Sequence, residues 1–372
     1  MSRKASFDTW LAVVVMAIVA AAASAFIFGC SHASSTPSNT PTDTTKHPTD
    51  TTHYPIVGSD TVLFSFVTFG CNRLDKGDTA GSPSTANIMQ LDRTFDDIMN
   101  LTPRPDMLIA TGDVILGKTI DTSVTGRQLR AWLAHYQSQP IASSGIKLIM
   151  VPGNHEFNDG AQSAPLEKQW LLVMAPYIVG TNGPKPGGND ALTTDQSQLT
   201  YSFDYKGSHF VMMNSDPALE GSTISVGWVS QDLVQARAAG AKHIFLFAHK
   251  PAYNWTNNGA TSLVGTANRD ALWSAMEANH AEAMFSAHNH IYRRMQPTGK
   301  SYMIVAGNGG SSLENPVGAD RNFGFTLVQV MTNGKVIEKA YAREYGTNYT
   351  DPCPSYQYPT TLRDSLDISW KY

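Results

Sequence analysis

The sequence has little charge and no concentrated charge of either sign. Of its 372 residues, 27 are Lys or Arg and 31 are Asp or Glu, which gives a formal net charge of -4. A slightly acidic chain without a basic block offers no electrostatic basis for binding nucleic acid. The glycine-rich segment AGNGGSS (306–312) is not followed by Gly-Lys-Ser/Thr, so a nucleotide-triphosphatase loop is not indicated. We find no internal repeat and no heptad pattern, which disfavours solenoids and coiled coils.

Cysteine is scarce: the chain has three, at Cys30, Cys71 and Cys353. If Cys30 carries a lipid, the one disulfide that remains open is Cys71 to Cys353. An extracytoplasmic location would permit that bond, but nothing in the sequence requires it. Cys71 has a second interpretation, as a metal ligand, given below.

The N-terminus has the features of a targeting segment. Positive charge in Met1-Ser-Arg-Lys precedes an apolar and small-residue run from Trp10 to Gly29. Cleavage after Ala23-Ser24-Ala25, retention as a spanning helix, and cleavage just before Cys30 all fit such a run. We favour the third, because IFGC (27–30) is similar to a bacterial lipoprotein box and a polar stretch follows it.

These features predict four segments. Residues 1–30 form a lipoprotein-type signal peptide ending at Cys30, and residues 31–55 form a Ser/Thr/Pro-rich tether that cannot bury apolar surface. Residues 56–343 form the folded domain, and residues 344–372 form a tail that packs on it. The predicted location is the cell envelope, with the protein anchored to a bacterial membrane through a lipid on Cys30. The sequence leaves the oligomeric state open.

Within the folded region, short apolar runs alternate with longer amphipathic patterns. Strands are predicted at 62–69, 106–111, 147–151, 200–205, 208–214, 243–248, 282–286, 302–306 and 324–331. Helices are predicted near 86–100, 126–138, 164–176, 228–239 and 268–280. The alternation predicts an α/β sandwich with mostly parallel inner strands, while 200–214 and 302–342 are expected to be hairpin-like and antiparallel.

Polar residues that can bind metal follow the ends of four predicted strands. They are Asp113, Asn154, His249 and the pair His288 and His290. In open α/β sheets, ligands bind at the carboxyl ends of the strands, so these side chains are expected to meet at one rim.

The residue types suit a centre of two metal ions. Carboxylate can bridge two cations, imidazole suits Zn, Fe or Mn, and the Asn154 amide offers an oxygen. Two such ions activate a bridging hydroxide and hold phosphoryl oxygens for in-line attack. His155 is adjacent to Asn154, and neighbouring side chains diverge, so His155 is the candidate general acid for the leaving group.

The motifs TGDV (111–114), GNHE (153–156), AHKP (248–251) and AHNH (287–290) together resemble those of the calcineurin-like metallophosphoesterases. The resemblance covers about residues 62 to 342 and is closest to the branch with purple acid phosphatases and cyclic-nucleotide phosphodiesterases. It implies a four-layer α/β sandwich of two mixed β-sheets flanked by helices. It also implies two ions: one held by Asp113, Asn154, His249 and His288, the other sharing Asp113 and taking His290.

The first family motif is altered. The family usually places Asp-x-His after the first strand, whereas this chain has Cys71 and Arg73 in those positions. Arginine stays protonated and cannot be a ligand. A thiolate ligand at Cys71 is our first interpretation, an empty or weak second site the next, and a carboxylate from Asp75 the last. Arg73, with Asn72, is the candidate contact for the substrate phosphate.

The predicted function is metal-dependent hydrolysis of small phosphomonoesters or phosphodiesters. It uses two divalent or trivalent ions such as Fe, Zn or Mn, a bridging hydroxide and the general acid His155. The alternative is a catalytically degenerate metal- or ligand-binding surface lipoprotein on the same scaffold, which the altered first motif favours.

Overall fold

The computed structural model describes residues 60–74, 81–161, 163–253, 263, 265–314, 322–344 and 359–371. The predicted signal peptide and tether, Asp75 and Cys353 lie outside these ranges. Within the described ranges, no helix combines the length and the apolar character needed to cross a membrane.

The strands form two six-stranded sheets. The first has the order β12-β11-β10-β1-β2-β3 and the second the order β4-β5-β6-β7-β9-β8. The first sheet comprises β1 (Val62–Phe69), β2 (Met107–Thr111), β3 (Lys147–Val151), β10 (Asn322–Met331), β11 (Val336–Glu344) and β12 (Thr361–Asp367). The second comprises β4 (Tyr201–Tyr205), β5 (Ser208–Met213), β6 (His243–Ala248), β7 (Ala283–Ser286), β8 (Tyr292–Met295) and β9 (Tyr302–Ala306).

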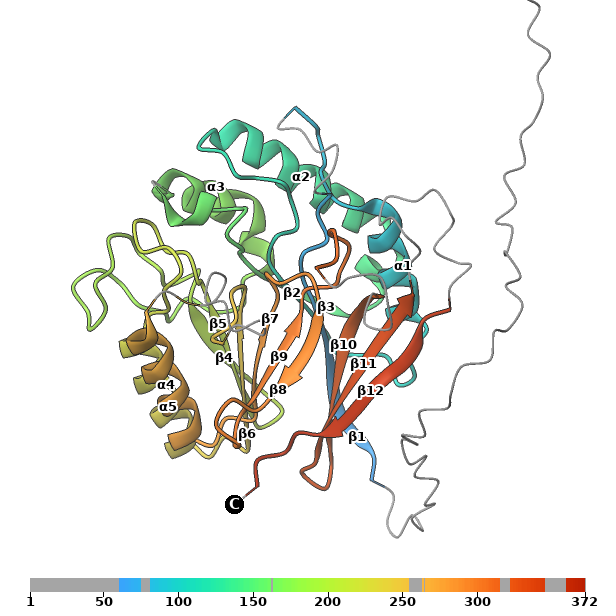
Figure 1. Cartoon of the computed structure of the whole chain (residues 1–372), viewed down its shortest axis with the longest axis vertical. Coiled ribbons are helices and arrows are strands. Elements are labelled where there is room, and N and C mark those ends of the chain that lie inside the picture. The colour runs from blue at the N-terminus through green and yellow to red at the C-terminus, as the bar shows by residue number, and fades with distance from the viewer. Residues whose placement is uncertain are drawn as a thin grey trace, which may run out of the picture. The chain divides into compact units, whose positions relative to one another are not determined.

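Helices cover the outer face of each sheet, as Figure 1 shows. The α-helices are α1 (Ile88–Met99), α2 (Thr122–Ser138), α3 (Ala164–Met174), α4 (Val226–Ala238) and α5 (Thr266–Ala278). Three short 3₁₀ turns accompany them: η1 (Pro140–Ser143), η2 (Asn158–Gly160) and η3 (Ala175–Tyr177). One core packs α1, α2 and α3 on the first sheet, and another packs α4 and α5 on the second.

The third core lies between the sheets and is rich in phenylalanine. In β1, Phe64 and Phe66 face the second sheet, whereas Val67 and Phe69 face the helices, because successive side chains of a strand point to opposite faces. The Phe66 ring meets Phe210 at a centroid distance of 5.5 Å and Phe245 at 5.2 Å. Burial on both faces explains why the inner strands are almost continuously apolar.

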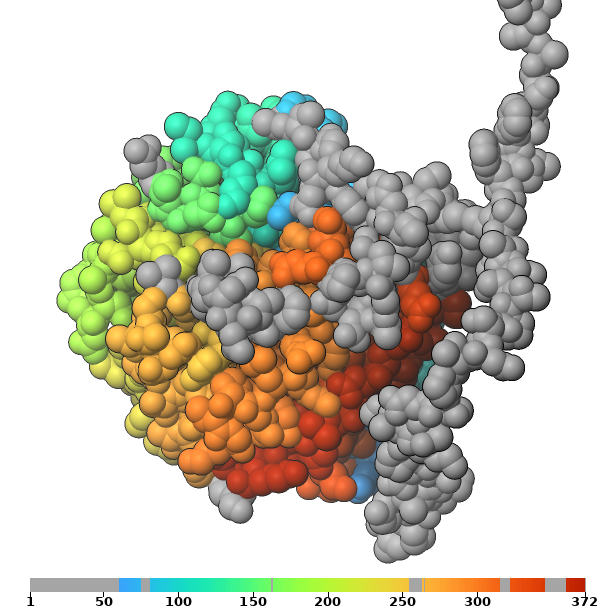
Figure 2. Space-filling view, viewed as in Figure 1, coloured from blue at the N-terminus to red at the C-terminus, as the bar shows by residue number. Residues whose placement is uncertain are grey.

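The predicted fold class is confirmed, because two mixed sheets flanked by helices make four layers. The antiparallel prediction for the segment 302–342 is confirmed for β10 and β11, which form a hairpin in the first sheet. It is confirmed only in part for β9, which pairs antiparallel with β8 but parallel with β7 in the second sheet. No strand was predicted for β8 or β12. Both are edge strands with polar, partly exposed side chains, so they lack the apolar runs that marked the others. The edge formed by β12 lies at the surface in Figure 2.

The parallel strands direct their following loops to a common rim. β1, β2 and β3 run parallel in the first sheet, as do β5, β6, β7 and β9 in the second. A backbone hydrogen bond joins the two sheets, because Gly70 N, after β1, donates to Ala306 O, at the end of β9, at 2.9 Å. Another joins two loops of the second sheet, because Ala287 N donates to His249 O at 2.9 Å. The candidate site residues stand on these loops.

Candidate metal centre

Three site residues have left-handed backbone conformations. The φ angles are 55° at Cys71, 55° at Asp113 and 65° at His288. This region is unfavourable for residues other than glycine, and such strain collects at functional sites when the surroundings enforce it. The loops also approach closely: a Cβ on Gly112 would stand 2.5 Å from the nitrogen of Gly153. Glycine at position 112 therefore lets the Asp113 loop lie against the Asn154 loop.

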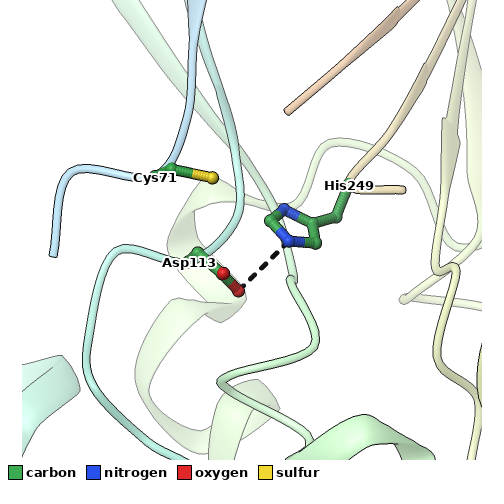
Figure 3. A group of neighbouring side chains, drawn as sticks. All are labelled: Cys71, Asp113 and His249. Carbon is green, nitrogen blue, oxygen red and sulfur yellow. Dashed lines mark ion pairs between the residues drawn. The ribbon is translucent and has the colours of Figure 1, made fainter. Parts of the chain in front are cut away.

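The structure brings together the four residues expected around the first ion. His249 Nε2 lies 3.2 Å from Asp113 Oδ1 and 2.9 Å from Asn154 Oδ1. His288 Nδ1 lies 3.0 Å from Asn154 Oδ1 and 3.3 Å from His249 Nε2. Asp113 and His249 are both nearly fully buried, and Figure 3 shows their side chains pointing toward each other. We call Asn154, His249 and His288, grouped around Asp113 Oδ1, the His249 side of the centre.

Neighbouring groups fix which atoms of the His249 side face the pocket. His249 Nδ1 donates to the carbonyl oxygen of Thr111 at 2.7 Å, so in the neutral ring Nε2 carries a lone pair. Asn154 Nδ2 donates to Asp159 Oδ1 at 2.7 Å, which turns the amide oxygen of Asn154 toward His249. A proton on His288 Nδ1 can be donated to only one of its two neighbours, Asn154 Oδ1 or His249 Nε2. With His249 neutral, lone pairs otherwise face one another in a buried space, an arrangement that a cation satisfies.

The spacing of these atoms also fits a metal ion. Donor atoms bonded to one ion at ~2.1 Å, in tetrahedral or octahedral geometry, lie ~3.0–3.4 Å from one another. The measured separations on the His249 side run from 2.9 to 3.3 Å. A set of imidazole, carboxylate and amide donors suits Zn, Fe or Mn.

The surroundings of Asp113 Oδ2 are different. Arg73 Nε lies 3.5 Å from this oxygen, and His155 Nε2 lies 3.9 Å from it. The positive charge of Arg73 also works to lower the pKa of Cys71, His155 and His290. We call Arg73, His155 and His290 the Arg73 side of the centre.

Cys71 lies between the two sides. Its Sγ accepts a hydrogen bond from the backbone nitrogen of His288 at 3.1 Å. Donor atoms of Cys71, Asp113 and His249 all lie within 4.8 Å of one another, as Figure 3 illustrates. The expected arrangement grouped Cys71 with His290, whereas this cluster groups it with His249. Burial and the charge of Asp113 raise the pKa of the Cys71 thiol well above its ordinary value.

Asp113 and His249 stabilise each other's charged forms. Burial opposes ionisation of Asp113, but the charges of His249 and His155 outweigh it and hold the pKa of that carboxyl well below its usual range. Burial likewise opposes protonation of His249, but the Asp113 carboxylate outweighs it and raises the pKa of that imidazole. Burial and the neighbouring His249 charge hold the pKa of His288 well below its ordinary value.

His155 and His290 are neutral imidazoles near pH 7. Burial lowers the pKa of each to about 4, with Arg73 adding to the effect. Each ring is also held by a carbonyl oxygen at Nδ1: His155 contacts Leu116 O at 2.5 Å and His290 contacts Ser312 O at 2.6 Å. A carbonyl can only accept, so in both neutral rings Nδ1 carries the proton and Nε2 carries a lone pair.

The sequence interpretation overlooked residues that position the centre. Glu156, the last letter of GNHE, accepts from the backbone nitrogens of Asp113 at 2.9 Å, Val114 at 2.9 Å and Gly153 at 2.7 Å. Its carboxylate therefore ties the Asp113 loop to the Asn154 loop. The motif carried that signal, whereas Asp159 lies in a patternless loop and could not have been found. Lys250, the residue that follows His249, forms an ion pair with Asp216, with 2.5 Å between Nζ and Oδ1.

The two candidate substrate contacts stand on the loop after β1. Arg73 is 9% exposed, and Asn72 is fully buried. Neither polar side-chain atom of Asn72 has a hydrogen-bond partner within the described part of the chain. Tyr253, on the loop after β6, packs against α5: its ring centroid lies 5.1 Å from that of Trp273 and 4.6 Å from the Arg269 guanidinium.

Comparison with known proteins agrees with this geometry. Residues 77–292 match the family model described as calcineurin-like phosphoesterase. Purple acid phosphatase 21 of Arabidopsis thaliana is 26% identical over 154 residues, which cover 40% of this chain and 31% of that protein. Four curated relatives of this kind match, and the chain spans between 28% and 49% of their length.

Solved structures share the fold at low sequence identity. A purple acid phosphatase from yellow lupin (Lupinus luteus) seeds has a TM-score of 0.54 and 16% identity, covering 84% of this chain and 54% of that one. A dimetal phosphatase from Danio rerio has a TM-score of 0.54 and 13% identity, covering 84% of this chain and 100% of that one.

Proposed function

Because the chain belongs to the calcineurin-like phosphoesterase family, we propose that it is a metal-dependent phosphoric ester hydrolase. The substrates are small phosphomonoesters or phosphodiesters. Family members use a dinuclear metal centre, and the curated relatives are named as purple acid phosphatases. When bound, a metal ion of this kind activates water and neutralises charge on the phosphoryl oxygens.

The side chains proposed to hold metal are those whose open lone pairs converge. On the His249 side they are Asp113, Asn154, His249 and His288. The observation that carries the proposal is the contact of His249 Nε2 with Asn154 Oδ1 at 2.9 Å and with Asp113 Oδ1 at 3.2 Å. While Nδ1 donates to Thr111 O, a neutral His249 has no proton on Nε2 for either oxygen. A metal ion satisfies all of these atoms together.

His155 is the proposed proton donor to the leaving oxygen. Its Nδ1 is committed to Leu116 O, so Nε2 is the atom available to a substrate, and it lies 3.9 Å from Asp113 Oδ2. A phosphate dianion placed beside that atom favours the imidazolium that protonates the leaving group. His155 thus acts next to the metal pocket without belonging to its ligand set.

Replacing the proposed acid tests this role. We expect His155→Ala to keep its metal content and to lose about 100-fold or more in kcat toward alkyl phosphates, with a smaller loss toward p-nitrophenyl phosphate. The matched control is His135→Ala, because His135 lies on α2 and pairs with Asp92 away from the site. Full activity of His155→Ala on good and poor leaving groups alike would refute the role.

We also propose that the protein is exported and lipid-anchored. The support is the N-terminal sequence: the apolar run ending at Cys30, then the polar tether of residues 31–55 before the domain at 56–343. Metabolic labelling with a palmitate analogue tests it, with Cys30→Ser as the control. Equal labelling of both chains, or of neither, argues against the anchor.

The rival function is a catalytically degenerate scaffold that binds metal or ligand at the cell surface. The altered first motif, with Cys71 and Arg73, favours it. Turnover assays on p-nitrophenyl phosphate and bis(p-nitrophenyl) phosphate separate the two. Metal-loaded protein that turns over neither ester supports the scaffold and contradicts the hydrolase.

A further inference from the structure

The Arg73 side does not fit a second metal ion. In a dinuclear centre the shared carboxylate must be open to both ions. Here Asp113 Oδ1 faces His249, but the Nε of the Arg73 guanidinium stands 3.5 Å from Oδ2. A guanidinium has five N–H donors and no lone pair to give a metal. The place of the second cation beside Asp113 is therefore taken by a side chain.

Arg73 is built into this position. Its backbone pairs with Ala86 in an antiparallel bridge, and Ser311 Oγ donates to its carbonyl oxygen at 2.8 Å. The next residue is held too, since Leu74 N donates to Thr85 O at 2.6 Å. These contacts fix the backbone of the segment, and the side chain itself is buried, so the guanidinium is part of the site and not a surface group.

The charge of Arg73 reaches the donors that the described part of the chain offers to a second ion. It acts on Cys71, Asp113 and His290, the three donors that the altered motif leaves. The side chain is buried, where charges are screened weakly. A divalent cation placed among these donors would meet a fixed positive charge that cannot be neutralised by deprotonation. A second ion is therefore disfavoured twice: Arg73 repels it, and the histidine ligand of the family motif is missing at position 73.

We propose that this chain binds a single metal ion, on the His249 side, and that Arg73 supplies the second positive charge of the centre. This inference deepens the proposed function and rests on its metal pocket. Arg73 pairs with Asp113 when substrate is absent, and its guanidinium binds a phosphoryl oxygen when substrate is present. The centre then needs one ion where its relatives need two.

Metal counting by mass spectrometry is the first test, on protein grown in Zn²⁺, Mn²⁺ or Fe and freed of loosely bound ions. We expect about one ion per chain in the wild type and about two in Arg73→His, which restores the usual ligand type of the family motif. The control is Arg93→His on α1, where Arg93 pairs with Asp97; it should stay at one. Two ions in the wild type, or one in Arg73→His, would overturn the proposal.

Kinetics give a second readout. We expect Arg73→Gln to keep one ion and to lose about 100-fold in kcat/KM, with partial recovery in Arg73→Lys, because lysine restores charge without the planar fork. Near-ultraviolet circular dichroism verifies that each variant is folded. Unchanged kcat/KM in folded Arg73→Gln overturns the role of its charge. Absence of turnover in the wild type would instead refute the proposed hydrolase, whatever the metal count.

Discussion

The two oxygens of Asp113 face opposite kinds of environment. On the His249 side, Oδ1 meets the ring nitrogen of His249, which in turn meets the amide oxygen of Asn154. Neighbouring carbonyl and carboxylate groups hold the ring and the amide in place. On the Arg73 side, Oδ2 meets a guanidinium that brings its own charge. One half of the centre is arranged to receive a cation, and the other half already contains one.

This difference shows how one substitution can change a site without changing a fold. The loop after β1 leaves the sheet beside the loops of β2 and β7, and backbone hydrogen bonds still join it to Gly112 and Ala306. The scaffold that positions the ligands is therefore kept. What changes is the charge and donor capacity of the side chain delivered to Asp113.

The strongest way to break the comparison is to remove one histidine from each side. We expect His249→Ala to lose its metal and at least about 1,000-fold in kcat/KM, since the buried pocket loses a ligand. His290→Ala should keep its metal, because Arg73 already excludes an ion there. Isothermal titration with Zn²⁺ and a phosphatase assay measure both. Equal loss of metal in the two variants contradicts the distinction between the sides.

A smaller change sharpens the account of the His249 side. Asp159→Asn removes the carboxylate that orients the Asn154 amide through the 2.7 Å bond from Nδ2. We expect metal affinity to fall about 10- to 100-fold, the usual effect of losing a group that orients a ligand. Asp195→Asn, at an exposed loop position, is the control. Unchanged affinity in Asp159→Asn shows that the amide is held by other contacts.

The smallest expected effect is on the pH dependence of stability, and it concerns a histidine outside both sides of the centre. His209 contacts Asp204 at 2.7 Å through Nδ1 and Asp232 at 2.8 Å through Nε2. Burial opposes protonation, but these carboxylates outweigh it and raise the pKa of His209 above its ordinary value of about 6.5.

A raised pKa in the folded state has a definite sign. The stabilisation is fully present below pH ~6.5 and is lost as the pH rises through the raised pKa of His209. Urea unfolding of metal-free protein across this range should show that decline in the wild type and a flatter profile in His209→Asn. A decline of the same size in both proteins means that other groups cause it.

Much of the fold follows from the apolar runs. β1, β3 and β6 coincide with predicted strands because both faces of each are covered, which makes their sequences almost wholly apolar. Edge strands such as β12 lack this signal. The parallel pairing of β9 with β7 depends on the crossover between these two strands, which no local sequence pattern encodes.

The centre shows the same limit. Asp113, Asn154 and His249 could be grouped because each follows a strand in a motif of fixed spacing. The ion pair of Arg73 with Asp113 joins residues 40 positions apart in sequence, and only the folded structure places them at 3.5 Å. The sequence showed that Arg73 cannot be a ligand, but not that its charge lies where a second ion would bind.

The most direct test of the central claim is a crystal structure of protein grown with Zn, Mn and Fe, with anomalous scattering data collected at the edge of each metal. The account predicts one strong peak within bonding distance of Asp113, Asn154, His249 and His288, and none beside Arg73. A pocket that holds only water on the His249 side would contradict it.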